Sequence, residues 1–274
     1  MEKSGYRIVR CPGCDLAYLD HEPVSDELEK FYSKDYFVSL DRTTGYTDYF
    51  ECENYLKLIF RRRLKIIEKY RDSGRLLDVG CGPGFFLEVL SDRWQPFGID
   101  ISEFAAATAR SRGLNVIQGL FDASLFEKEF FDAVTMWNTL EHFTDPMKAL
   151  LSANAVLKPG GVLAFYTNDI GGLFARMMGK YWHMLLVPDH LFFFTRASLT
   201  KMLEAAGFSV IKSGPETLFL SADYLLEHFL KIFGTKFDRK NLFGGVKPAL
   251  NRIYLPINLF DTLTVYARKE TGVA

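Results

Sequence analysis

The chain has 274 residues, of which 48% are hydrophobic and 24% charged, and this composition excludes a disordered or fibrous protein. Lysine and arginine (33) balance aspartate and glutamate (34), so the chain lacks the clustered positive charge from which binding to nucleic acid draws its affinity. No stretch approaches the roughly 18 apolar residues of a membrane span, and no apolar signal segment follows the first residues. We therefore expect a cytoplasmic protein with one main domain and no nucleic-acid partner.

Aromatic residues are unusually frequent, since 25 Phe and 13 Tyr help to bring their share to 15%. A core alone seldom needs so many, which predicts an apolar groove or an interface. The one basic run, Arg61-Arg62-Arg63, falls within a helical pattern and is interpreted as a solvated helix face rather than an anion site.

Cysteines occur at positions 11, 14, 52 and 81, and only Cys11 and Cys14 form a C-x-x-C turn. Such a turn presents two thiolates to one metal, but a structural zinc site needs four ligands. Cys52, His21 or a second chain would have to complete it, so we treat zinc as the lesser alternative to a pair of reduced thiols and expect no metal.

Residues 1–46 are expected to contain turns and one short helix that begins at Ser25 and carries Tyr32 on its apolar face. A helical period then runs from 47 to 70. Beyond residue 74, helices and strands alternate with short connections. Strands are predicted at 75–79, 97–99, 115–117, 131–136, 162–166, 208–211 and 261–268, and helices at 85–90, 102–112, 146–157 and from 195 to before 207.

This alternation is typical of an α/β domain with a doubly wound, mostly parallel sheet covered by helices on both faces. Ser102, Asp145 and Thr195 are predicted N-caps, and Pro146 suits the first turn of its helix. Residues 219–258 interrupt the rhythm with a broadly apolar helix beginning at Phe219. We expect a helical insertion that serves as core, dimer contact or wall of an apolar site.

The segment from Leu76 to Gly84 contains the sharpest signal for chemistry. A buried strand leads into the turn Gly80-Cys81-Gly82-Pro83-Gly84, so the backbone can approach a ligand at the carboxyl end of the sheet. The spacing G-x-G-x-G differs from the dinucleotide motif, and Asp78 places a carboxylate where a pyrophosphate would be repelled. A ligand that carries a positive group is favoured.

A second carboxylate, Asp100, ends the next strand twenty residues beyond Gly80. Two hydroxyls of a ribose can donate to a carboxylate at this place. Local roles are the alternatives, because Asp78 could cap a turn and Asp100 could cap the helix that begins near Ser102. Together, in this order, the two motifs predict a site for a nucleoside-containing cosubstrate.

These motifs resemble the class I S-adenosylmethionine-dependent methyltransferases, specifically the branch that acts on small molecules. The resemblance spans roughly residues 47–274 and includes three later motifs: Leu140-Glu141-His142, Pro188-Asp189-His190-Leu191 and Ala206-Gly207-Phe208. It implies a seven-stranded, Rossmann-like methyltransferase domain at 47–274 behind a small N-terminal segment at 1–46. That segment, Leu28 to Phe37 included, is also similar to relatives that carry a second C-x-x-C upstream, which this chain lacks.

The resemblance implies S-adenosylmethionine as cosubstrate and a role for each matching residue. Gly80, Gly82 and Gly84 would lie against its methionine part, Asp78 near its ammonium group, Asp100 on the ribose, Ile101 and Asp122 at the adenine, and Trp137 with Asn138 along the passage to the acceptor.

Methyl transfer to a hydroxyl requires an acceptor held in line, exclusion of water and a base. Histidine is the natural base, and His190 is the first candidate because its loop follows a strand on the ligand side of the sheet. His142 is the second, with a purely structural role as its alternative. Aromatic residues of the N-terminal segment (Tyr36, Phe37, Tyr46, Tyr49 and Phe50) could form a lid over the site or simply pack on the sheet edge.

The sequence thus predicts a methyltransferase whose acceptor is a small, lipid-linked or sugar-linked molecule, with a hydroxyl as the expected target. Two other functions are weighed against it: a non-catalytic protein that binds S-adenosylmethionine as a scaffold, and a nicotinamide-dependent oxidoreductase. The third glycine comes one residue early for the oxidoreductase motif. A homodimer is compatible with the sequence.

Overall fold

The computed structural model describes residues 1–20, 32–38, 49–221 and 254–271. Its contacts group the chain into two units, the larger made of residues 1–215 with 260–274 and the smaller of residues 216–259. The predicted boundary at residue 46 falls among residues 39–48, outside the described part of the chain. We describe each unit by itself.

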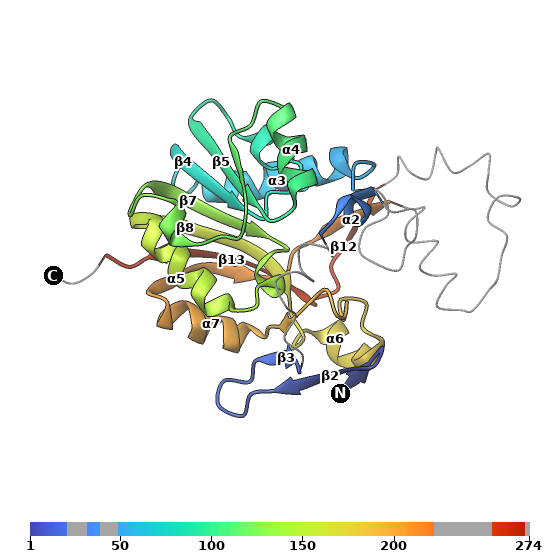
Figure 1. Ribbon diagram of the computed structural model, residues 1–274. Helices are drawn as coiled ribbons and strands as arrows, with labels where there is room; N and C mark the ends of the chain where they lie inside the picture. The colour runs from blue at the N-terminus through green and yellow to red at the C-terminus, as the bar shows by residue number, and fades with distance from the viewer. Residues whose placement is uncertain (21–31, 39–48, 222–253, 272–274) are drawn as a thin grey trace, which may run out of the picture. The chain divides into compact units, whose positions relative to one another are not determined.

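A seven-stranded sheet forms the centre of the larger unit, in the order β10-β13-β8-β7-β4-β5-β6 (Figure 1). Its strands are β4 (Gly74–Val79), β5 (Trp94–Asp100), β6 (Val116–Gln118), β7 (Phe131–Trp137), β8 (Leu157–Asn168), β10 (Phe208–Gly214) and β13 (Thr262–Lys269). The four pairings among β6, β5, β4, β7 and β8 are parallel, whereas β13 runs antiparallel to both β8 and β10. The predicted mostly parallel, doubly wound sheet is confirmed.

Helices cover both faces of this sheet (Figure 1). They are α3 (Glu53–Ile67), α4 (Glu103–Ser111), α5 (Pro146–Val156) and α7 (Arg196–Ala205). Side chains of α5 and α7 share one apolar core cluster with the sheet, and side chains of α3 and α4 share another. Because the strands are buried on both faces, they read as nearly continuous apolar runs in the sequence.

The predicted helix starts are confirmed by their capping hydrogen bonds. The backbone N–H of Ala105 donates to Ser102, and that of Lys148 donates to Asp145. Thr195 and Ser198 form a reciprocal capping box before α7. Each bond satisfies an amide that the first helical turn leaves without a partner.

Two predictions within this domain need correction. The expected helix at 85–90 is only a 3₁₀ turn, η1 (Leu87–Val89), because Leu90 returns to an extended conformation. Strand β8 begins at Leu157 rather than 162, since Leu157 already pairs with Phe131 across an irregularity in the β7 ladder. Both differences depend on pairing between distant segments, which local periodicity does not contain.

For the N-terminal segment only turns and one short helix were predicted, and the structure adds strands to them. This segment supplies β1 (Glu2–Lys3), β2 (Tyr6–Arg10) and β3 (Ala17–Leu19), and β3 pairs with the distant β9 (Phe192–Phe193). A helix is present at α2 (Lys34–Val38), whereas the helix expected from Ser25 falls mostly among residues 21–31, outside the described part. Ala175 of helix α6 (Leu173–Met178) and Trp182, just after the 3₁₀ turn η4 (Gly179–Tyr181), belong to the same core cluster as β2 and β3.

The smaller unit contains an antiparallel pair, β11 (Leu218–Ser221) with β12 (Tyr254–Ile257). The helix predicted to begin at Phe219 is therefore wrong at its first residues. A short apolar run fits a strand as well as a buried helix, and here the partner strand decides. The rest of the predicted insertion, residues 222–253, lies outside the described residues.

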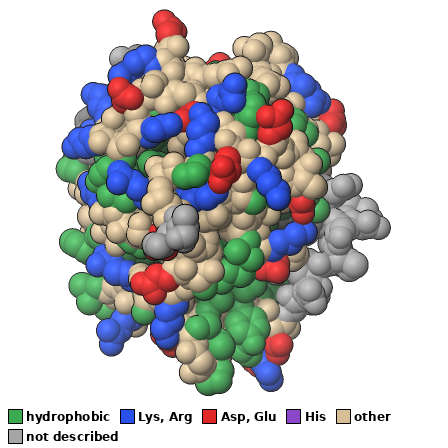
Figure 2. All heavy atoms as spheres, turned by 90° about the vertical axis from the view of Figure 1, so that its left-hand side faces the viewer, with side chains coloured by type: hydrophobic (Ala, Val, Ile, Leu, Met, Phe, Trp, Pro, Cys, Tyr) green, Lys and Arg blue, Asp and Glu red, His purple; other side chains and the backbone are tan. Residues whose placement is uncertain are grey.

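No helix among the described residues is long and apolar enough to cross a membrane. On the face of the molecule in Figure 2, basic and acidic side chains are interspersed rather than gathered by sign. Apolar side chains collect in the lower part of that view.

Candidate functional site

The glycine turn lies where the sequence predicted, directly beyond the carboxyl end of β4. Gly80, Gly82 and Gly84 have φ values of +69°, +55° and +89°, a conformation that side-chain-bearing residues rarely adopt. A Cβ on Gly80 would stand 2.6 Å from the side chain of Thr139. On Gly82 it would meet only the rings of Tyr49 and Phe37, no nearer than 3.8 Å, so the backbone of the turn stays approachable there.

Asp78 and Asp100 are both buried beside this turn. Burial raises the pKa of Asp78 to about 8, although the hydroxyl of Thr135 donates to its Oδ1 at 2.6 Å. Burial also raises the pKa of Asp100 to about 6, against hydrogen bonds from the backbone N–H groups of Ser102 (2.8 Å) and Gly82 (2.7 Å). A buried carboxylate with a raised pKa gains stability when a cation or a donor approaches it.

Arg63 is a candidate site residue that sequence reasoning missed. The interpretation of the Arg61-Arg62-Arg63 run as a solvated face holds for its first two members, but Arg63 is only 4% exposed. Its guanidinium carbon lies 4.6 Å from the ring centroid of Trp137 and 4.3 Å from that of Tyr166. Its charge also lowers the pKa of Asp78. The apolar residues at i−4 and i+1, Ile59 and Leu64, were the available signal, because they put position 63 on the inner face of α3.

The other predicted cosubstrate residues lie at the ends of β7 and β5, the two strands that flank β4. Trp137 ends β7, and its indole Nε1 is buried with no hydrogen-bond partner among the described residues. Asn138 follows with φ +51°, and its backbone N–H donates to the carbonyl of Tyr166 at 3.0 Å. Ile101 is half-buried just beyond β5.

Asp122 is tied to local partners. It caps the 3₁₀ turn η2 (Ala123–Leu125), accepts hydrogen bonds from the backbone N–H and hydroxyl of Ser124, and pairs with Lys148 at 2.9 Å. These bonds hold its pKa well below the usual range. The predicted contact with adenine would have to compete with them.

Aromatic rings of the N-terminal segment adjoin the glycine turn. Phe37 is buried, with its ring centroid 5.9 Å from that of Tyr49, and Tyr49 stacks on Phe85 at 5.4 Å. Tyr36 contacts both Phe37 and Tyr32 edge to face. Phe50 packs on Phe85 and Phe104, while Tyr46 lies outside the described residues.

His142 ends the 3₁₀ turn η3 (Leu140–His142), three residues after Thr139, whose side chain a Cβ on Gly80 would meet. Its Nδ1 lies 2.9 Å from the backbone oxygen of Asp189, 3.0 Å from Oδ1 of Asp189 and 2.9 Å from the hydroxyl of Tyr32. A carbonyl oxygen can only accept, so Nδ1 carries a hydrogen and Nε2 is the atom that can take up a proton. Tyr32 in turn donates to Asp189 at 3.3 Å.

The two histidines have opposite electrostatics. Burial alone would lower the pKa of His142, but the carboxylates of Asp189 and Glu141 raise it to about 9. Burial and the nearby charge of His142 lower the pKa of His190 to about 3, although its Nδ1–H donates to the carbonyl of Met184 at 2.9 Å. His142 is thus a cation at neutral pH, and His190 stays neutral.

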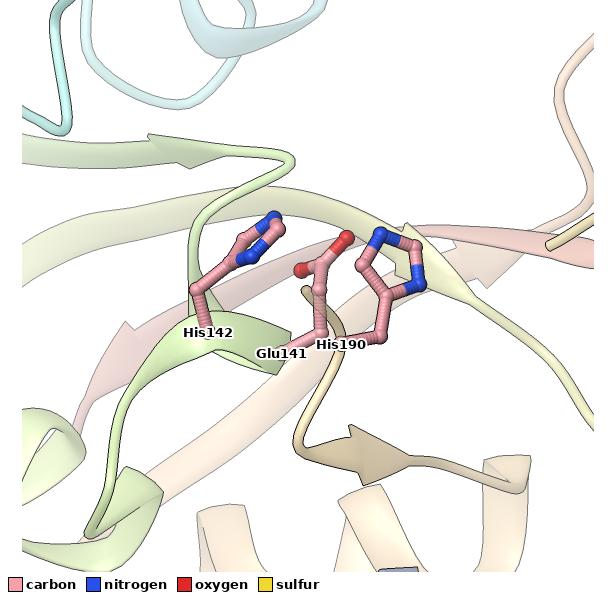
Figure 3. Close-up of side chains that lie close together, drawn as sticks. All are labelled: Glu141, His142 and His190. Atoms are coloured by element: carbon pink, nitrogen blue, oxygen red, sulfur yellow. The ribbon is translucent and has the colours of Figure 1, made fainter. Parts of the chain in front are cut away.

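The structure brings Glu141, His142 and His190 together (Figure 3). The ring centroids lie 4.9 Å apart, and the ligand atoms of the three side chains fall within 4.8 Å of one another. The hydroxyl of Thr167 donates to Oε2 of Glu141, and Oε1 has no partner among the described residues. A metal ion would fit by spacing alone, but the proton that Asp189 and Glu141 hold on His142 competes with any cation there.

Cys11 and Cys14 lie in the turn between β2 and β3, and both are free thiols. Hydrogen bonds from the backbone N–H groups of Cys14 and Gly13 lower the pKa of Cys11. His21, one of the further zinc ligands considered, lies outside the described residues.

A family model described as a methyltransferase domain matches residues 52–213, more than half of the chain. A ubiquinone biosynthesis O-methyltransferase of Coxiella burnetii is 30% identical over 171 residues, which cover 57% of this chain and 73% of the relative. An uncharacterized protein of Methanocaldococcus jannaschii is 27% identical over 167 residues, covering 61% and 80%.

Solved structures agree in fold. A SAM-dependent methyltransferase from Archaeoglobus fulgidus matches with a TM-score of 0.53 and 20% identity, over 81% of this chain and 99% of the other. One from Thermotoga maritima matches with a TM-score of 0.53 and 22% identity, over 81% and 93%. At these identities the likeness concerns the fold.

Proposed function

The match over more than half of its length makes this chain a member of the methyltransferase family, an S-adenosylmethionine-dependent enzyme, and from that premise we propose that it methylates a hydroxyl oxygen of a small, largely apolar acceptor. The observation that carries the hydroxyl assignment is His142, whose Nδ1–H is held by Asp189 so that Nε2 can accept a proton. The relative from Coxiella burnetii is named an O-methyltransferase, which supports the same choice.

Side chains near the ends of β4 and β7 fit the ammonium and the carboxylate of an amino-acid group. Asp78 offers a buried carboxylate to an ammonium. Arg63, on α3, offers a cation to a carboxylate, and Trp137 offers its Nε1–H, which has no partner among the described residues. Asp100 stands at the next strand end with a carboxylate suited to a ribose diol. We assign these four residues, with the approachable backbone at Gly82, to the cosubstrate. When bound, S-adenosylmethionine supplies a methyl group made electrophilic by its sulfonium.

His142 rather than His190 is proposed as the base, although sequence reasoning favoured His190. A base with a pKa of about 3 binds a proton too weakly to help a hydroxyl, whereas deprotonated His142 is a strong acceptor. His190 and Glu141 would then shape the wall beside His142. Leu191 donates its backbone N–H to the carbonyl of Glu141 at 2.9 Å, which holds the two segments together.

The aromatic side chains Tyr32, Tyr36, Phe37 and Tyr49 are proposed to exclude water above the glycine turn and His142. Each is linked to the next by ring contacts, and the hydroxyl of Tyr32 reaches both His142 and Asp189. A dry, apolar entrance would favour aromatic or prenylated acceptors over charged ones.

Two measurements test this function. Calorimetric titration with S-adenosylmethionine and its demethylated product, with NAD as the control ligand, tests the cosubstrate. Transfer of a labelled methyl group is then measured to a catechol, its prenylated form and the matching aromatic diamine. We expect the hydroxyl acceptors to be methylated, the prenylated one with the higher kcat/KM.

His142→Gln should lower kcat by about 10² to 10⁴, the usual contribution of a general base, without weakening the binding of S-adenosylmethionine. His183→Gln is the matched control, because that histidine is partly exposed and pairs with Asp261 at 3.7 Å rather than with the Glu141–His190 group. Preferential methylation of the diamine, or full activity of His142→Gln, would overturn the proposal.

A further inference from the structure

Exposed apolar side chains gather on α6 and η4. Leu173 and Met177 lie one turn apart on α6, and Tyr181 ends η4; 64%, 74% and 72% of their surfaces are exposed. Phe260, 54% exposed, adjoins Leu173, since its carbonyl accepts the backbone N–H of Leu173 at 3.1 Å. The opposite side of the same segment is packed, with Ala175 and Trp182 buried in the core cluster that includes β2 and β3. The exposed apolar side chains therefore do not contribute to this core.

Within residues 170–188 the charged side chains have one sign, whereas Asp169 and Asp189 flank this range. Residues 170–188 contain Arg176, Lys180 and His183 but no aspartate or glutamate, in a chain whose total charge is nearly balanced. Arg176 and Lys180 are exposed beside the apolar row. Asp261, the acid nearest to His183 at 3.7 Å, is buried and also accepts the indole N–H of Trp182. Apolar side chains flanked by exposed cations are the composition of a segment that lies in the interface of an anionic bilayer.

One short stretch of chain connects this face to the candidate site. Segment 170–188 begins two residues after the end of β8 and leads directly into Asp189 and His190. The carbonyl of Met184 holds the His190 ring, and that of Leu186 accepts the His190 backbone N–H at 2.6 Å. A membrane in contact with α6 would thus lie beside the segment that carries the partner of His142.

We propose that Leu173, Met177, Tyr181 and Phe260, with Arg176 and Lys180, form a docking face for the surface of a membrane that contains anionic lipids. Docking there would bring a lipid-soluble acceptor to the site without crossing bulk water. This surface role goes beyond the proposed methyl transfer and does not depend on it, because lipid binding needs neither cosubstrate nor acceptor.

The test is flotation of the full chain with vesicles of phosphatidylcholine alone and of phosphatidylcholine mixed with phosphatidylglycerol, at low and at raised salt. We expect partition onto the anionic vesicles only, weakened by salt. The double substitution Arg176→Gln with Lys180→Gln should lower partition onto the anionic vesicles about 25-fold, which is about fivefold for each basic residue. Met177→Glu should lower it at least tenfold.

Leu151→Glu is the matched control, because Leu151 is also half exposed but lies on α5, away from segment 170–188. Circular dichroism melting of each variant tests that it folds, and Met177→Ser replaces Met177→Glu if the latter does not. Binding equal to neutral and anionic vesicles, no binding by the native chain, or unchanged binding by Met177→Glu would overturn the proposal. A dimer in light scattering that Met177→Glu abolishes, without vesicle binding, would assign the face to a second copy of the chain.

Discussion

Replacing Asp189 by Asn should move the titration of His142 by more than two pH units. Asp189 faces this ring with both a carboxylate oxygen and a backbone carbonyl, and Glu141, His190 and Tyr32 are the other polar groups beside it. The substitution removes the charge and keeps the carbonyl. Nδ1 therefore stays the donor and the ring keeps its orientation, so the change isolates electrostatics.

The expected size of the shift follows from the pKa of His142 with and without the Asp189 carboxylate. With Asp189 the pKa of His142 is about 9; without it the pKa should fall to the ordinary 6.5 or below, because burial then dominates. The difference corresponds to about 3 kcal/mol. At pH 7 the fraction of His142 in the base form rises from about 1% to roughly three quarters.

Nitrogen-15 histidine NMR measures this shift without an acceptor, and the spectrum is simple because the chain has five histidines. His142→Gln assigns the ring. In the native protein we also expect kcat to rise with pH up to about 9, and in Asp189→Asn to level off near 6.5. Asp92→Asn, an exposed acid ahead of β5, is the control and should change neither curve.

A native His142 midpoint near 6.5, or a midpoint near 9 that persists in Asp189→Asn, would refute the argued role of Asp189. The stability of the native protein supplies a second check on the sign. Because the folded pKa of His142 is raised, its contribution to stability is fully present below pH 6.5 and is lost as the pH rises through about 9.

Three further predictions concern the cosubstrate site and His190. Asp100→Ala should weaken binding of S-adenosylmethionine at least tenfold in calorimetry, because it removes both the ribose acceptor and the hydrogen bond that holds Gly82; unchanged affinity would contradict this placement. Arg63→Met should also weaken binding at least tenfold, whereas Arg62→Met, on the exposed face of α3, should not, and equal effects of the two would remove Arg63 from the site. His190→Gln should make stability less sensitive to acid: the native histidine, with a pKa lowered to about 3, contributes stability above pH 6.5 that is lost as the pH falls, about 2 kcal/mol by pH 5. Urea unfolding of both proteins at pH 7 and pH 5 measures that difference, and parallel losses would count against a neutral buried His190.

Much of the fold could be predicted from the sequence because its signals are local. The caps at Ser102, Asp145 and Thr195 need only a side chain and the next turn of backbone, and the glycine turn needs only positive φ angles at its own residues. Buried parallel strands can be recognised in the sequence as apolar runs. The positions of Asp78 and Asp100 at neighbouring strand ends follow from the same pattern.

What the sequence left undecided depends on partners far along the chain. The strand at Ala17–Leu19 exists because β9 lies beside it, and the strand at Leu218–Ser221 because of β12. Register and pairing of this kind are long-range properties that no short window contains.

The choice between the two candidate bases was likewise made only by tertiary structure. His142 and His190 look alike in the sequence, since each follows an acid directly. In the fold, Asp189 turns its charge and its carbonyl toward His142, while His190 meets the carbonyl of Met184 and a cationic neighbour. Burial lowers the pKa of either ring, and only contact with a carboxylate raises the pKa again. The sequence by itself identified the two candidate bases, and the packing decided how each of them is charged.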